Sequence, residues 1–281
     1  MDRSSERRGS VHQPTVQAFG DEWTRFNQSS ANANELESVF LQYFGAFPWQ
    51  LLPADAIGFD LGCGSGRWAV LAASRVGTLV CVDASIAALR VAQRNAKVCP
   101  LVLGAAGALP LRPCSMDFGY SLGVLHHLSD PLSSLTDAVA ALKPGAPLLI
   151  YLYYAFDNRR PWFRVVWRVS DGMRRLVSRC PRPVRFGLSE LLAATVYFPL
   201  ARLAGLWERS GRPVASIPLA AYRNLSFYTM RTDALDRFGT RVEHRFTRPE
   251  VMDLMERAGL ERVSVSDEPP YWCAVGFRPS D

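Results

Sequence analysis

The feature that most constrains the fold is a glycine-rich segment that runs from Gly58 to Trp68, with glycines at 62, 64 and 66. An apolar run leads into it and helical spacing follows it, so we expect a strand, a tight loop and a helix. Glycines at alternate positions let the backbone turn sharply and approach a ligand closely. The spacing differs from the dinucleotide pattern G-x-G-x-x-G, because the third glycine comes one residue early. The loop therefore suits an amino-acid-sized group better than a pyrophosphate.

Short apolar runs alternate with helical stretches after residue 56, which predicts an α/β fold with a doubly wound, mostly parallel sheet. A closing antiparallel hairpin ends the chain, and a capping box at Thr247 opens a helix that Gly259 ends. The predicted strands are 56–61, 78–83, 100–104, 116–122, 147–153, 261–267 and 271–277, and the other predicted helices are 35–45, 67–75, 86–96 and 131–142.

Four segments follow from this pattern. They are an N-terminal lead and lid helix (1–45, with 1–34 mostly loose), a ligand-binding core (46–154), a helical insertion (155–240) and a C-terminal part of the core (241–281). The insertion leaves the sheet at the carboxyl end of its fifth strand, where ligands bind in such folds. We therefore expect it to be a cap that determines the substrate.

One predicted helix of the insertion is amphipathic and basic. Its apolar stripe is expected to be buried against the core, because prolines 181, 183 and 199 break the segment into short pieces. A second subunit, a lipid-like ligand and an acidic membrane surface remain alternatives. The stripe comprises Trp162, Val165, Val166, Val169, Met173, Leu176 and Val177, and Arg164, Arg168, Arg175 and Arg179 lie on the other side.

The positive charge is concentrated in the insertion. The chain has a net charge of +6, whereas residues 157–212 hold 12 arginines against four acidic residues, a net of +8. The rest of the chain is slightly acidic, so we expect no nucleic-acid partner.

Six cysteines without a C-x-x-C pair indicate neither a zinc site nor a disulfide framework, and we expect no metal. The polar stretch from Met1 to Gly20 lacks the apolar region of a signal peptide. The apolar window 188–207 is interrupted by Glu190, Pro199 and Arg202, so we expect no membrane span. These features predict a cytoplasmic protein, and the sequence leaves oligomerisation and peripheral membrane contact open.

Asp83 falls at the end of the second predicted strand, 17 residues after Gly66. A carboxylate at this edge of the sheet can accept both hydroxyls of an adenosine ribose, although such a residue also caps the next helix in many proteins.

The chain resembles class I S-adenosylmethionine-dependent methyltransferases of the small-molecule type, similar to ubiquinone and menaquinone methyltransferases. The resemblance covers about 56–153 and the closing hairpin, and rests on Asp60-Leu-Gly-Cys-Gly-Ser-Gly66, Asp83, Leu109 to Phe118, Leu125-His-His-Leu128 and Leu142-Lys-Pro-Gly145. It implies a Rossmann-like methyltransferase fold and S-adenosylmethionine as the cofactor. By position, the glycine loop would take the methionine part, Asp83 the ribose, and the segment after the third strand the adenine.

The implied cofactor residues are Trp23, Asp60, Gly62, Cys63, Gly64, Gly66, Asp83, Ala84, Ala105, Ala106 and Leu122. Trp23 could serve as a lid over the cofactor or as an anchor of the lead. Where many relatives carry an acid for the adenine amino group, this chain has Ala105-Ala106-Gly107, so adenine would be read by backbone and packing.

His126 and His127 follow the fourth strand, and either could be a general base or simply structural, with His126 favoured. The substrate candidates are Tyr154, Tyr222, Tyr228, Arg231, Tyr271 and Trp272. The expected reaction is methyl transfer to an oxygen or nitrogen of a small organic molecule. The alternatives are a nucleic-acid or protein methyltransferase and a non-catalytic cofactor-binding or membrane-surface protein.

Overall fold

The computed structural model describes residues 13–214 and 216–280, which divide into two compact units. Among the described residues, the core unit contains 13–28, 37–155 and 242–280, and the helical unit contains 29–36, 156–214 and 216–241. The insertion expected over 155–240 thus belongs to the helical unit, to which the short segment 29–36 is added.

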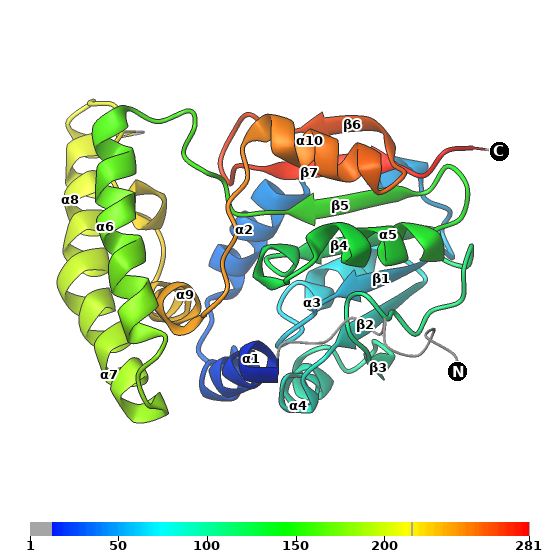
Figure 1. Cartoon of the computed structure of the whole chain (residues 1–281), viewed down its shortest axis with the longest axis horizontal. Coiled ribbons are helices and arrows are strands. Elements are labelled where there is room, and N and C mark those ends of the chain that lie inside the picture. The colour runs from blue at the N-terminus through cyan, green and yellow to red at the C-terminus, as the bar shows by residue number, and fades with distance from the viewer. Residues whose placement is uncertain (1–12, 215, 281) are drawn as a thin grey trace, which may run out of the picture. The chain divides into compact units, whose positions relative to one another are not determined.

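The core unit is built on a seven-stranded sheet in the order β3-β2-β1-β4-β5-β7-β6 (Figure 1). β1 to β5 pair in parallel, whereas β7 is antiparallel to both β5 and β6. The order reverses between β1 and β4, and at such a point the loops after the two strands diverge and leave a crevice. The strands are β1 Ile57–Leu61, β2 Thr78–Asp83, β3 Leu101–Leu103, β4 Phe118–Leu122, β5 Pro147–Tyr151, β6 Glu261–Val265 and β7 Cys273–Phe277.

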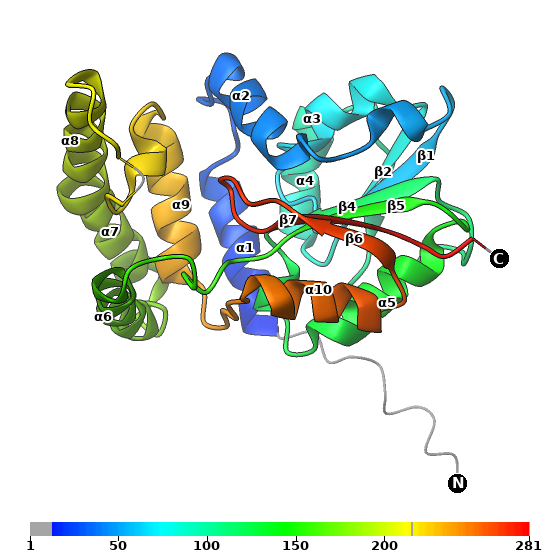
Figure 2. The ribbon, with the colours of Figure 1, turned by 90° about the horizontal axis from the view of Figure 1, so that it is seen from above.

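Helices cover both faces of this sheet, as expected for a doubly wound fold. Figure 2 shows α3 (Ala69–Ala72) and α4 (Ile86–Asn95) over one face and α5 (Pro131–Ala141) and α10 (Arg248–Arg257) over the other. The central strands β4 and β5 are almost wholly buried, which explains their continuous apolar sequence. The predicted α/β fold is confirmed.

Two helices precede the sheet. α2 (Ala33–Phe44) lies close to its predicted bounds, and its Phe44 packs edge-on against Tyr120 of β4. The expectation of a loose lead was wrong for α1 (Gln13–Arg25), a helix that packs along α4. Its apolar residues Val16, Phe19 and Trp23 recur at helical spacing, which is the signal that would have identified it. Residues 1–12 lie outside the described part of the chain.

The helical unit contains α6 (Pro161–Val177), α7 (Arg182–Leu192), α8 (Phe198–Arg209) and α9 (Phe227–Gly239). α6 and α7 both pack on α9. Val177, Tyr197, Met230 and Phe238 belong to the buried cluster that holds the unit together.

Pro181 lies at the break between α6 and α7, as expected, but the expectation that Pro183 and Pro199 break the segment further was wrong. Residues 182–209 form one continuous helix, because Pro183 lies in its first turn and a π-helical turn, Ala193–Tyr197, comes just before Pro199. By length and composition alone this helix could cross a membrane, since its best window has a mean hydropathy of 1.2 and is 22% buried. The sequence predicted no membrane span because Glu190, Pro199 and Arg202 interrupt this window, but the helix continues through all three positions.

The prediction that the apolar stripe of α6 is buried was wrong for six of its seven residues. Val177 is buried, whereas the other six members of the stripe are between 41% and 70% exposed. The buried side of α6 instead carries Asp171, Arg174 and Ser178.

Candidate cofactor and acceptor pocket

The glycine loop begins where β1 ends, and its backbone requires glycine at two places that the pocket depends on. Gly62 has a φ of +80° and Gly64 a φ of +54°, in the left-handed region that strains other residues. A Cβ on Gly62 would lie 2.3 Å from Val124, and one on Gly64 would lie 2.6 Å from the Trp23 indole nitrogen. The loop is therefore packed tightly between the β4 loop and α1.

Asp83 ends β2 and connects to this loop. Its Oδ2 accepts a hydrogen bond from the Gly64 backbone N–H at 2.9 Å, and its Oδ1 accepts one from the Ser85 N–H at 2.7 Å. Burial raises the pKa of Asp83 above its ordinary value, although these backbone N–H groups lower it. Each carboxylate oxygen retains acceptor capacity, as hydrogen bonds from a pair of hydroxyls would require.

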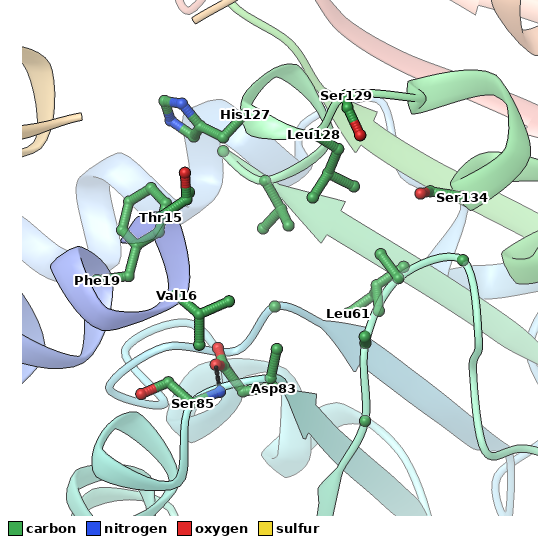
Figure 3. Close-up of a pocket in the computed structure, with 18 of the residues that line it drawn as sticks. Thr15, Val16, Phe19, Leu61, Asp83, Ser85, His127, Leu128, Ser129 and Ser134 are labelled. Carbon is green, nitrogen blue, oxygen red and sulfur yellow. Dashed lines mark hydrogen bonds between the residues drawn. The ribbon is translucent and has the colours of Figure 1, made fainter. Parts of the chain in front are cut away.

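A pocket of about 180 Å³, partly open to solvent, lies at the carboxyl ends of β1, β2 and β4. Figure 3 shows Thr15, Val16 and Phe19 of α1 on one side of it, with Asp83 and Ser85 below them. His127, Leu128 and Ser129 form another side. Every residue that lines the pocket belongs to the core unit.

Seven of the eleven predicted cofactor residues line this pocket, namely Trp23, Gly62, Asp83, Ala84, Ala105, Ala106 and Leu122. Gly64 shapes its edge through Trp23 and Asp83, as described above. Asp60, Cys63 and Gly66 do not line it.

Asp60 has a different role in the structure. Its side chain is buried, and its Oδ2 accepts a hydrogen bond from the Tyr120 hydroxyl at 3.0 Å. Burial raises its pKa well above the ordinary value, which the Tyr120 hydrogen bond offsets in part. Asp60 therefore supports the base of the loop by joining β1 to β4.

The two histidines occupy different environments. His126 is completely buried and stacks on Tyr153 with ring centroids 3.8 Å apart, and neither of its ring nitrogens has a hydrogen-bond partner among the described residues. Burial lowers its pKa well below the ordinary value, so the ring is neutral. His126 does not line the pocket, which is contrary to the preference for it as a base.

His127 does line the pocket, beside Phe19, whose ring centroid lies 5.0 Å from its own. Its Nδ1–H donates to the carbonyl oxygen of Val242 at 2.7 Å. A carbonyl only accepts, so the neutral ring carries its proton on Nδ1 and its lone pair on Nε2. This tautomer is the one that can accept a proton at Nε2.

The predicted substrate residues do not line the pocket. In the core unit, Tyr154 packs on Tyr271 with centroids 5.0 Å apart, and the buried Trp272 donates its indole N–H to Phe246 O. In the helical unit, Tyr222 packs on Tyr197, Tyr228 lies on α9, and Arg231 forms an ion pair with Glu190.

Several pocket residues were missed by the sequence reasoning. Thr15, Val16 and Phe19 come from the unpredicted helix α1, and Ser129, Asp130, Ser133 and Ser134 surround the start of α5. Asp130 is the N-cap of α5, and its Oδ1 accepts a hydrogen bond from the Ser133 N–H at 3.0 Å. Ser134 donates to Asp130 O at 3.1 Å, and a Cβ at residue 107 would lie 3.4 Å from its Oγ. No group of three or more metal-ligating side chains occurs within residues 13–214 and 216–280.

Comparisons with known proteins agree with this geometry. Residues 59–150 match the family model described as a methyltransferase domain. A curated relative, an uncharacterized 37.1 kDa protein in a transposon of Streptomyces fradiae, is 32% identical over 124 residues, which is 42% of this chain and 34% of the relative. The matching region thus spans about a third of that relative's length.

Solved structures share the fold at low identity. An S-adenosylmethionine-dependent methyltransferase of Thermotoga maritima, described as a possible histamine N-methyltransferase, aligns with a TM-score of 0.50 and 17% identity over 92% of this chain and 99% of its own. An S-adenosylmethionine-dependent methyltransferase of Methanosarcina mazei aligns with a TM-score of 0.50 and 16% identity over 83% of this chain and 96% of its own.

Fold and site together define a Rossmann-like α/β protein with a ligand pocket at the switch point of its sheet. More specifically, residues 59–150 match a methyltransferase domain, the sheet has the class I Rossmann-like order, and S-adenosylmethionine is the cofactor that this match indicates. The residues of the pocket fit this cofactor, because a ribose acceptor, apolar walls and a tight glycine loop meet there. The finer resemblance to ubiquinone and menaquinone methyltransferases stays a prediction.

Proposed function

We propose that this protein is an enzyme that transfers the methyl group of S-adenosylmethionine to an oxygen or nitrogen atom of a small organic molecule. The observation that carries the proposal is that Asp83, the start of the glycine loop and His127 line the same pocket. A cofactor site and a proton acceptor thus share one cavity at the switch point.

The cofactor residues divide into polar and apolar contacts. The Asp83 carboxylate accepts the ribose hydroxyls, and Ala84, Ala105 and Leu122 form apolar walls against the adenine. The Ser134 hydroxyl has lone pairs beyond its own hydrogen bond to Asp130 O, and it lies beside Gly107. It supplies the acceptor for the adenine amino group that Ala105-Ala106 lacks.

When bound in this pocket, S-adenosylmethionine would supply an electrophilic methyl group to an oxygen or nitrogen nucleophile. The chain contributes mainly position and the exclusion of water, which can account for much of such a rate. His127 Nε2 takes the proton that the acceptor's O–H or N–H gives up. Val16 and Phe19 of α1 present an apolar side to the acceptor, which favours a small molecule over a charged polymer.

Two measurements on the purified full-length protein test this function. Calorimetry should detect binding of S-adenosylmethionine, and methyl-labelled cofactor should deliver its label to compounds from a pool of small amines, phenols and alcohols. An Asp83→Ala variant, which should bind S-adenosylmethionine more weakly, is the control for the cofactor site. Absence of cofactor binding would refute the proposal. Transfer of the label only to protein or nucleic acid would show that the methyl acceptor is a macromolecule and not a small molecule.

A further inference from the structure

The outward face of α6 is an apolar stripe with charged neighbours. We call Trp162, Val165, Val166, Val169, Met173 and Leu176 the α6 stripe. At 3.6 residues per turn these positions fall within about 100° of the helix circumference. Their exposed fractions run from 41% for Met173 to 70% for Leu176.

The rotation of α6 is fixed by polar contacts, which explains why an apolar stripe faces outward. Arg174 is 4% exposed and donates from Nε to Asp171 Oδ1 at 2.8 Å. Its Nη1 donates to the carbonyl oxygens of Thr240 and Arg241 at 3.0 and 3.2 Å. Turning the stripe inward would break these bonds and leave buried charges unpaired, at a large cost in stability.

A row of arginines runs along one border of the stripe. Arg164, Arg168 and Arg179 are exposed and form no ion pair with the described residues, and Arg175 pairs with Asp171. The neighbouring helix 182–209 repeats the combination, with Leu191, Leu203, Leu206 and Trp207 between 47% and 60% exposed. Arg209 and Arg212 follow at its C-terminal end.

We propose that the helical unit docks on the surface of a membrane that contains anionic lipids, with the α6 stripe in the interfacial layer. An apolar face beside a row of arginines, three of which form no ion pair with the described residues, is the pattern of an interfacial helix. Trp162 and Trp207 suit the headgroup level. Arg164, Arg168 and Arg179 then meet lipid phosphates. A second copy of the chain fits less well, because Asp171 is the only acidic residue of α6 and is buried and already paired, so a second α6 offers these arginines no exposed counter-charge.

This inference is independent of the methyl acceptor, because no residue of the α6 stripe lines the pocket. It also differs from a membrane span, since it places α6 parallel to the surface and its arginines outside the hydrocarbon.

Flotation of the full-length protein with vesicles tests the proposal. The protein should float with phosphatidylcholine vesicles that contain phosphatidylglycerol, and added salt should weaken the binding. Each arginine near an anionic surface contributes about fivefold in affinity, so R164Q/R168Q/R179Q should lower the affinity on the order of 100-fold. The matched control, R90Q/R94Q/R112Q, removes three exposed arginines of the core unit and should float like the wild type.

A second pair of variants separates the apolar contribution. V169S/L176S should weaken flotation, whereas I86S/V98S, which changes two exposed apolar residues of the core unit, should not. Circular dichroism and calorimetry with S-adenosylmethionine would show that all variants are folded.

Five results would overturn the proposal. They are no flotation, equal flotation with pure phosphatidylcholine, and equal losses in the test and control variants. The fourth is self-association that V169S/L176S abolishes without any vesicle binding, because this result would assign the stripe to a second copy. Resistance of the cellular protein to alkaline carbonate extraction would also contradict surface docking and favour a span.

Discussion

The Asp83 carboxylate accepts a hydrogen bond from the Gly64 backbone N–H at 2.9 Å, and this contact joins the end of β2 to the glycine loop after β1. The two signals that identified the cofactor site in the sequence are thus physically connected. The carboxylate holds the loop and also faces the pocket.

Replacing Asp83 with alanine should therefore weaken S-adenosylmethionine binding by about 1.5–3 kcal/mol, the cost of losing hydrogen bonds to a charged acceptor. Titration calorimetry measures this directly. Asp55→Ala, which removes an exposed acid just before β1, should leave the affinity unchanged. Wild-type affinity in Asp83→Ala would show that the ribose is held elsewhere.

The loop glycines give a second prediction. Gly62→Ala should lower the melting temperature more than Gly211→Ala, although both positions have similar φ values of +80° and +76°. The left-handed strain of about 1–2 kcal/mol is common to both. A Cβ at residue 62 would in addition meet Val124 at 2.3 Å, whereas one at 211 meets nothing within 4 Å.

Val124→Ala in the Gly62→Ala background should recover part of the extra loss, about 1–3 kcal/mol, because it removes the atoms that clash. Equal melting temperatures for Gly62→Ala and Gly211→Ala would mean that the loop relaxes away from Val124.

The parts of the structure that the sequence predicts well are those that local residue types dictate. The seven strands lie within a few residues of their predicted bounds. The five parallel strands were found because they form apolar runs between glycine and proline signals, and the closing hairpin because Pro269 and Pro270 separate its two strands. Asp83 was predicted as a site residue for a similar reason, because a side chain at the carboxyl end of a parallel strand lies at the edge of the sheet where ligands bind.

The wrong predictions depend on contacts between distant residues. The orientation of α6 is set by Arg174, whose carbonyl partners Thr240 and Arg241 are more than 60 positions away. Periodicity alone favours burial of the apolar side, so the stripe was assigned to the core. The missed helix α1 has a polar composition, and its contact with α4 is what gives it a defined place.

Asp60 gives a prediction about stability and pH. Its pKa in the folded protein is raised well above the ordinary value, mainly by burial, so the folded state binds this proton more tightly than the unfolded state. The contribution of Asp60 to the unfolding free energy should therefore fall as pH rises from about 4 through the raised pKa, and then stay constant.

Urea unfolding of the wild type and Asp60→Asn across this pH range measures that contribution as a difference. The variant keeps an oxygen that can accept from Tyr120 but cannot ionise, so its stability should decline less with rising pH. Asp55→Asn, at an exposed position, should follow the wild type. Parallel curves for the wild type and Asp60→Asn would contradict the assigned burial cost.

The two adjacent histidines should have separable effects on catalysis. His127 lines the pocket with its proton held on Nδ1 by Val242 O, so His127→Gln should lower kcat by about 100-fold and leave S-adenosylmethionine affinity unchanged. His126 is buried against Tyr153, and His126→Phe keeps an aromatic ring there, so kcat should change by no more than about twofold. The stability of the wild type and His126→Phe should differ at acid pH. Burial lowers the pKa of His126 in the folded state, so the unfolded state binds this proton at a higher pH than the folded state does. His126→Phe should therefore resist unfolding better than the wild type below about pH 6.5. If His127→Gln retains full kcat at every pH, methyl transfer depends on positioning alone and His127 is not the base.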